Sequence, residues 1–91
     1  MSENHPKRRF DISARVVADE TVVLDLGAAQ IHQLNATASF IWNRCDGHCT
    51  VGEIAEKLAE SFDVDYETAR QAVQTTLHRF DELGLLDSAR Q

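Results

Sequence analysis

The segment Cys45-Asp46-Gly47-His48-Cys49 holds the side chains best suited to chemistry, because thiolates and imidazoles are ligands that Zn²⁺ prefers. A structural zinc site normally has four ligands in two separated pairs, and this segment offers a single group of three. The other candidates, His32 and His78, stand at no spacing typical of a zinc site. The pattern therefore favours Cys45 as a core side chain and Cys49 as a loop thiol. We expect no metal and no cofactor.

Motifs typical of catalysis are absent from the sequence. It contains no Gly-rich phosphate loop, no His-Glu-x-x-His motif and no serine nucleophile elbow. Its acidic pairs, such as Asp19-Glu20 and Asp81-Glu82, fall at expected turns and helix ends, where carboxylates are solvated or compensate helix dipoles. The sequence therefore predicts a protein that is not an enzyme.

Composition narrows the classes of partner. The 91 residues, 43% hydrophobic and 26% charged, suit one globular domain. The net charge of −6 combines +2 in residues 1–9 with −8 in the rest, and an acidic domain repels nucleic-acid phosphates. No apolar run approaches the ~20 residues that cross a bilayer, and the N-terminus resembles no secretory signal. We therefore expect a cytoplasmic protein with reduced thiols and neither a nucleic-acid nor a membrane partner.

Hydrophobic periodicity predicts a sheet followed by helices. Apolar residues alternate with period two from Ser13 to Leu34, which predicts three short strands in an antiparallel meander. The strands are expected at residues 15–18, 21–26 and 31–34. The expected turns are Asp19-Glu20 and Gly27-Ala28, and Gly27 is the residue free to adopt a positive φ.

After Leu34 the period becomes helical. Three helices of ~10, ~13 and ~18 residues are expected, with Cys45 still on the first and Gly47 ending it. The expected N-terminal boundaries are Asn35 as a cap, the Thr50–Glu53 capping box, and Asp65 at the start of the third helix. Gly84 is expected just past the third helix, with Leu85 and Leu86 folding back as apolar closure.

The predicted fold is therefore α+β: an N-terminal three-stranded antiparallel sheet followed by three helices, which is a winged helix-turn-helix. One domain is expected over residues 13–87, with a flexible basic tail at 1–12 and a short C-terminal tail at 88–91. The third strand lies at an edge and lacks the Lys, Glu or Pro that usually protects edges. Such an edge is either covered by the chain itself or accepts an added peptide strand, and it also allows a homodimer.

The third helix separates two kinds of binding protein. A DNA-reading helix needs basic or amide side chains aimed at bases and phosphates. Between residues 66 and 83 there are two arginines, Arg70 and Arg79, against three acids. This surface suits a peptide better than a polyanion. A winged-helix DNA-binding regulator and a protein-docking subunit of a biosynthetic complex are the alternatives.

An ordered set of short motifs resembles the PqqD-like family, from about Ser13 to Leu86. The set consists of Leu34-Asn35-Ala36-Thr37-Ala38, Ile41-Trp42, Asp46-Gly47, Thr50-Val51, Ile54-Ala55, Leu58 and Leu83-Gly84-Leu85-Leu86. The resemblance implies a RiPP recognition element, a non-catalytic peptide chaperone that binds the leader segment of a ribosomally made precursor peptide. It also implies presentation of that leader to a modifying enzyme, such as a radical SAM enzyme or a leader peptidase.

The resemblance further implies where the leader binds, by strand addition to the third strand beside the third helix. Carried onto this chain, the edge is Gln30, Ile31, His32, Gln33 and Leu34. The groove wall is drawn from Arg70, Val73, Gln74, Leu77 and His78. Apolar leader residues spaced by two or three are expected to fill it. The net charge of −8 in residues 10–91 favours a leader that carries Lys or Arg.

Overall fold

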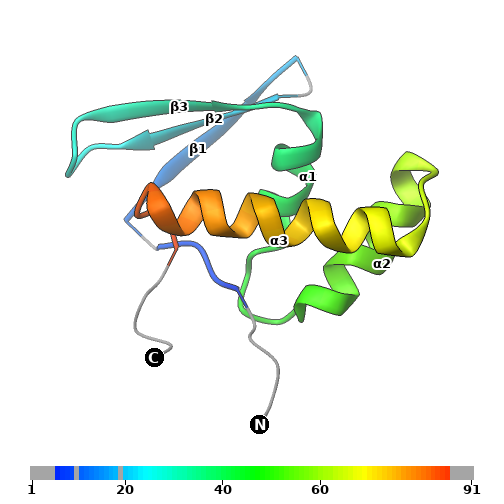
Figure 1. Cartoon of the computed structure of the whole chain (residues 1–91). Helices are drawn as coiled ribbons and strands as arrows, with labels where there is room; N and C mark the ends of the chain where they lie inside the picture. The colour runs from blue at the N-terminus through cyan, green and yellow to red at the C-terminus, as the bar shows by residue number, and fades with distance from the viewer. Residues whose placement is uncertain (1–5, 10, 19, 87–91) are drawn as a thin grey trace, which may run out of the picture.

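The computed structural model describes residues 6–9, 11–18 and 20–86. The elements follow in the order β1 (Ser13–Val17), β2 (Glu20–Asp25), β3 (Gln30–Leu34), α1 (Ala36–Asn43), α2 (Val51–Phe62) and α3 (Tyr66–Glu82). The strands pair antiparallel in the order β1-β2-β3. The α+β prediction of a sheet followed by three helices is confirmed, and the arrangement is consistent with a winged helix-turn-helix (Figure 1).

The core lies where the sheet meets the helices. Figure 1 shows the sheet as one layer, α3 running along it, α1 descending from the end of β3, and α2 packed against α3. The rings of Trp42 and Phe80 meet edge to face, with centroids 5.3 Å apart. Around this pair lie further buried apolar side chains: Val23, Leu34, Ile41, Ile54, Leu58, Val73 and Leu85. The contact between Trp42 and Phe80 thus holds α3 against α1, and α1 in turn lies against the inner face of the sheet.

The expected helix caps are present. The Asn35 side chain accepts a hydrogen bond from the Ala38 amide at 2.8 Å, and Asp65 caps α3 in the same way. Thr50 and Glu53 form both bonds of the capping box. These caps satisfy amide groups that the first turn of a helix leaves without partners.

The first helix is shorter than expected. It ends at Asn43, so Cys45 lies beyond the helix, although its side chain is fully buried as predicted. The Arg44 amide bonds the Ile41 carbonyl and the Cys45 amide bonds the Trp42 carbonyl. These i to i+3 bonds tighten and end the last turn before Gly47 (φ 86°) is reached.

The turn predictions are wrong in detail. In the two connections between strands, the described residues with positive φ are Ala18 (51°) and Ala29 (56°), whereas Gly27 has no positive φ. Asp19, part of the first expected turn, lies outside the described residues. In the β2–β3 connection the Asp25 carboxylate accepts from the Ala28 amide at 3.2 Å, and the Ala29 amide bonds the Leu26 carbonyl at 3.3 Å. The side-chain bond fixes the start of this turn, and the left-handed conformation falls on its last residue.

The N-terminal segment (Pro6–Arg9) is paired with the rest of the domain. The Gly47 amide bonds the Pro6 carbonyl, the Arg8 amide bonds the Cys45 carbonyl, and the Arg9 amide bonds the Leu85 carbonyl, all at 2.8–3.0 Å. Polar composition does not reveal backbone pairing of this kind with distant segments, and the flexibility expected for residues 1–12 stays a prediction. Residues 1–5, 10 and 88–91 of the expected tails, and residue 87 at the end of the expected domain, lie outside the described residues.

The two faces of β2 differ in burial. Thr21, Val23 and Asp25 are at most 3% exposed and face the helices, while Val22 and Leu24 are half-buried on the outer face. The predicted alternation is present, and its inner face is the one that carries an acidic residue. A carboxylate in that position needs charged or hydrogen-bonding partners.

Candidate peptide-binding site

The inner end of the β2–β3 ladder contains a serine bridge. The buried Ser39 hydroxyl accepts from the Thr21 amide at 2.8 Å and donates to the Leu34 carbonyl at 3.1 Å. The backbone of Leu34 therefore faces β2. Because backbone groups alternate in direction along an antiparallel strand, the same holds for His32.

The backbone groups of Ile31 and Gln33 consequently point away from β2, toward the open side of the sheet. No strand in the described part of the chain pairs on that side of β3. The Ile31 side chain is 71% exposed on the outer face. The sequence-predicted edge is therefore present with free amides and carbonyls, which is the geometry that an added strand requires.

A groove of about 470 Å³, the β3–α3 groove, runs beside this edge. It is lined by Ile31, His32, Gln33, Leu34, Asn35, Ala38, Thr75, Thr76, Arg79, Phe80 and Leu83. A strand added to β3 would direct the side chains opposite His32 and Leu34 into the groove, because alternate residues share a face. Four of the five predicted edge residues line the groove, and Gln30 is exposed at the start of β3 without lining it.

The α3 residues predicted for the groove wall are not brought to it. Val73 is fully buried in the core and Leu77 is half-buried against it. Arg70, Gln74 and His78 are exposed. None of these five residues lines the β3–α3 groove.

The wall is formed by the other flank of α3. Arg70 and Arg79 are nine residues apart, about two and a half helical turns, so they lie on opposite sides of the helix. The residues missed by the sequence analysis are Thr75, Thr76, Arg79, Phe80 and Leu83. The apolar stripe of α3 identifies the face of the helix that is buried. The two sides of the helix that flank this stripe cannot be told apart by hydrophobic periodicity. The one feature of the sequence that indicates this side of the helix is the small size of the Thr75 and Thr76 side chains, which leaves room for a peptide.

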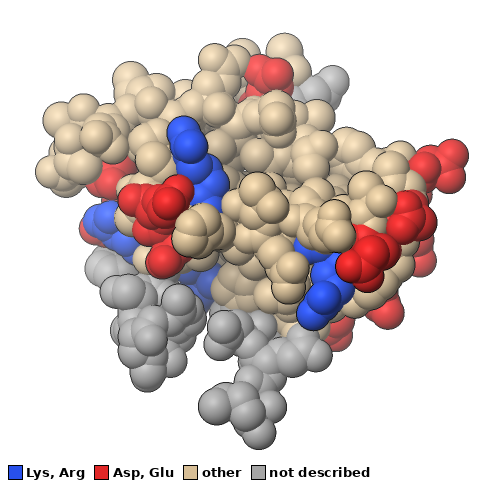
Figure 2. Space-filling model, viewed as in Figure 1, with Lys and Arg blue, Asp and Glu red and all other residues tan. Residues whose placement is uncertain are grey.

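The groove differs in charge from the chain as a whole. Among the described residues, its lining includes Arg79 and His32 and no Asp or Glu. The Nε2 atom of His32 is buried and has no hydrogen-bond partner among the residues that the structure describes. Figure 2, drawn from the same side as Figure 1, shows a largely neutral surface with acidic side chains gathered toward the left and right of the view.

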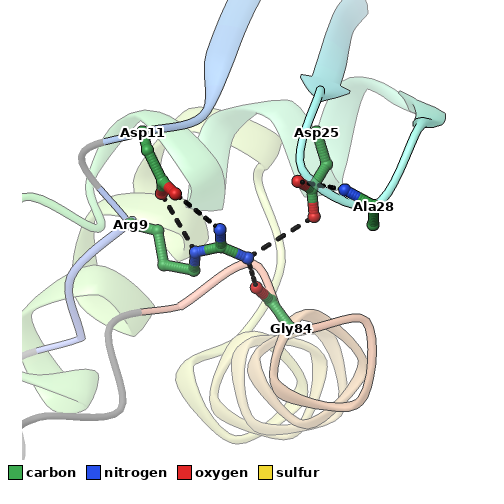
Figure 3. Close-up of polar contacts among 5 residues, drawn as sticks. All are labelled: Arg9, Asp11, Asp25, Ala28 and Gly84. Carbon is green, nitrogen blue, oxygen red and sulfur yellow. Dashed lines mark hydrogen bonds and ion pairs between the residues drawn. The ribbon is translucent and has the colours of Figure 1, made fainter.

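A polar cluster joins the far end of the β2–β3 hairpin to the end of α3 (Figure 3). The Arg9 guanidinium donates to the Gly84 carbonyl at 2.8 Å, to Asp25 at 3.4 Å and to both carboxylate oxygens of Asp11. Asp25 in turn accepts from the Ala28 amide. The hydrogen bond from Arg9 lowers the pKa of Asp11. The cluster thereby sets the position of the hairpin, and with it β3, relative to α3.

Sequence comparison identifies the family. A family model described as coenzyme PQQ synthesis protein D (PqqD) matches residues 20–86, which includes β2, β3 and all three helices. The chain belongs to the PqqD family. No curated protein gives a significant match to its sequence.

Two solved structures share the fold of this PqqD-family chain. One is TbiB1 in complex with the TbiA(beta) leader peptide, at a TM-score of 0.82 and 23% identity, covering 90% of this chain and 95% of that one. The other is lasso peptide synthetase B1 complexed with the leader peptide, at a TM-score of 0.81 and 23% identity, covering 91% and 98%. Likeness over nearly the full length of each chain shows that the fold is the same.

The remaining reactive groups of this PqqD-family chain form no site of their own among the described residues. Among the described residues no three His, Cys, Asp or Glu side chains are grouped as a metal site would require. Burial raises the pKa of the Cys45 thiol to about 12, and the thiol donates to the Ile41 carbonyl. Cys45 is therefore a neutral core group at ordinary pH. No helix within the described ranges has the length and apolarity to span a membrane.

Proposed function

We propose that this chain is a non-catalytic chaperone that binds the leader segment of a ribosomally made precursor peptide by strand addition to β3. The open edge of β3 beside the β3–α3 groove is the observation that carries this proposal. Membership of the PqqD family supports it, as does the shared fold with two proteins solved as leader-peptide complexes. The bound leader is presented to a modifying enzyme, a radical SAM enzyme or a leader peptidase, in the cytoplasm.

The energetics indicate which contacts must carry the affinity. Ordering a leader residue costs about 1–2 kcal/mol, and each ladder bond returns a net ~0.5–1.5 kcal/mol. Backbone pairing with Ile31 and Gln33 is therefore insufficient by itself. Burying an apolar side chain contributes about 1.5–3 kcal/mol, so one or two apolar leader residues packed on Leu34 and Phe80 supply the balance.

The test compares proline substitutions on the two edges of the sheet. The Ile31 amide points away from β2, so Ile31→Pro removes a docking donor and no β2–β3 bond. By the same alternation the Val16 amide points away from β2 on the opposite edge, and Val16 is 67% exposed. Val16→Pro is therefore a matched control.

The measurement is fluorescence anisotropy with the labelled synthetic leader of any short precursor peptide whose reading frame is found to adjoin the gene. We expect Ile31→Pro to weaken binding by about tenfold or more, since a ladder bond and its neighbours are lost, and Val16→Pro to bind as the parent does. Equal affinity of parent and Ile31→Pro would exclude strand addition to β3. Thermal unfolding of both variants establishes that they fold.

Presentation to an enzyme is tested separately. A candidate modifying enzyme, a radical SAM enzyme or a leader peptidase, is assayed on the full precursor with and without the chain, and again with Ile31→Pro. We expect modification to require the parent chain and to fall with the variant. Modification at the same rate without the chain would contradict the proposed role.

A further inference from the structure

The charge of the groove is opposite to that of the protein. The chain carries −6 overall, yet the lining of the β3–α3 groove, as far as the structure describes it, contains a cation, Arg79, an imidazole, His32, and no carboxylate. The expectation of a basic leader, made from the sequence, rests on the net charge of the domain and not on the charge of the groove. Short-range contacts inside a groove decide which side chain is accepted there, while distant charges mainly affect the rate of encounter.

Arg79 is available for a ligand. Its side chain is exposed, and no ion pair involves it within the described ranges. Glu82, one turn further along α3, is instead paired with His78 at 3.3 Å. By contrast Arg9 is held by two carboxylates. Arg79 therefore offers unused hydrogen-bond donors at the mouth of the groove.

His32 adds a second polar group on the same lining. It pairs with Val23 across the ladder, and its side chain lies on the inner face of β3, two residues from Leu34. Burying a polar atom without a hydrogen-bond partner costs free energy, and Nε2 of His32 has no such partner among the described residues. A ligand that forms a hydrogen bond with this atom would remove that cost. A ligand group placed opposite His32 in an added strand would reach the region between this atom and Arg79.

We infer that the leader carries an Asp or Glu at the position opposite His32, where its carboxylate is bound by Arg79 and by Nε2–H of His32. This inference rests on the proposed function. Asp and Glu are the anionic side chains of an unmodified ribosomal peptide, and a carboxylate accepts several donors at once. The leader residue two positions away, opposite Leu34, is apolar. The recognition motif is thus an acidic and an apolar residue separated by one residue that faces away from the groove.

The experiment is selection of displayed random 15-residue peptides on the full-length chain. Three immobilised proteins are used in parallel: the parent, Arg79→Glu and Arg70→Glu. The Arg70→Glu control changes the same residue type on the same helix by the same charge, on the side away from the groove. Peptides selected on the parent are then measured by anisotropy against all three proteins and against Ile31→Pro, with thermal unfolding as a check on folding.

We expect peptides selected on the parent to be enriched in Asp or Glu two residues from an apolar residue. Their affinity should fall about tenfold or more in Arg79→Glu and hold within about twofold in Arg70→Glu. Peptides selected on Arg79→Glu should carry Lys or Arg at that position. Binders that require the β3 edge yet show no acidic preference, or that respond equally to the two arginine variants, would overturn the inference and leave the proposed function standing. Binders indifferent to Ile31→Pro would overturn both.

Discussion

The guanidinium of Arg9 lies 3.4 Å from the carboxylate of Asp25, a residue only 3% exposed on the inner face of β2. The same guanidinium donates to the Gly84 carbonyl just past α3. One side chain from the N-terminal segment thus neutralises a buried acid and connects the β2–β3 hairpin to the helix that forms the groove wall. The site depends on a residue that lies outside both elements that line it.

The first prediction concerns this contact. Arg9→Ala leaves the Asp25 carboxylate in the core without its cation, so we expect a lower unfolding temperature, by several degrees for a domain of this size. Adding Asp25→Asn removes the stranded charge and should recover part of the loss. Thermal unfolding of parent, single and double variants measures both effects. Additive losses in the double variant would contradict the ion-pair explanation.

The second prediction separates stability from binding at His32. Because Nε2 is buried and has no partner in the described part of the chain, His32→Leu removes an unsatisfied polar atom and should leave the free energy of unfolding unchanged or raise it by up to about 1–2 kcal/mol. The same change should weaken leader binding, since the ligand loses a donor. Urea unfolding and anisotropy report the two quantities. A large loss of stability would show that the imidazole has a structural partner.

The third prediction concerns the serine bridge between strands. Ser39→Ala leaves the Thr21 amide and the Leu34 carbonyl unpaired in a buried position, with an expected loss of about 1–3 kcal/mol in the free energy of unfolding. The exposed Ser61, on α2, provides the matched control, and Ser61→Ala should change the same quantity by less than about 0.5 kcal/mol. Similar losses from the two substitutions would argue against the bridge.

The fourth prediction concerns the two thiols. Cys45 is fully buried with a pKa of about 12, whereas Cys49 is half-buried. At pH 8 we expect iodoacetamide to modify Cys49 in the native protein and both cysteines in guanidinium chloride, as counted by mass spectrometry. Equal native reactivity of the two would contradict the burial of Cys45.

The same thiol predicts a loss of stability in alkali. The pKa of Cys45 is raised from the ordinary 9.0 to about 12 in the folded state. The thiol ionises more readily in the unfolded chain, so its contribution to stability is complete below pH 9 and is lost as the pH rises toward 12. Cys45→Ala should therefore show a flatter stability profile over this range in urea unfolding.

Local features of the fold could be predicted from sequence. The caps at Asn35, Thr50 and Asp65 are bonds between residues three apart, so both partners stand in the same short stretch of sequence. The change from period two to a helical period likewise depends on neighbouring residues alone. The period-two pattern thereby places the third strand, which lies at an edge of the sheet.

The wall of the groove could not be predicted in this way. Periodicity separates the buried stripe of α3 from its exposed face, whereas the angle at which the helix crosses the sheet decides which flank meets β3. That angle is set by packing between distant residues, such as Phe80 on Trp42. The Arg9–Asp25 contact was missed for the same reason, because the two partners belong to segments with no local relation.

The bridge between Arg8 and Leu86 brings the beginning and the end of the described domain side by side. A domain whose two ends lie close together can be inserted into a surface loop of a larger protein without stretching either linker. Grafting this domain into an unrelated carrier protein, with both junctions outside residues 6–86, should therefore transplant its recognition of ligands as a portable unit.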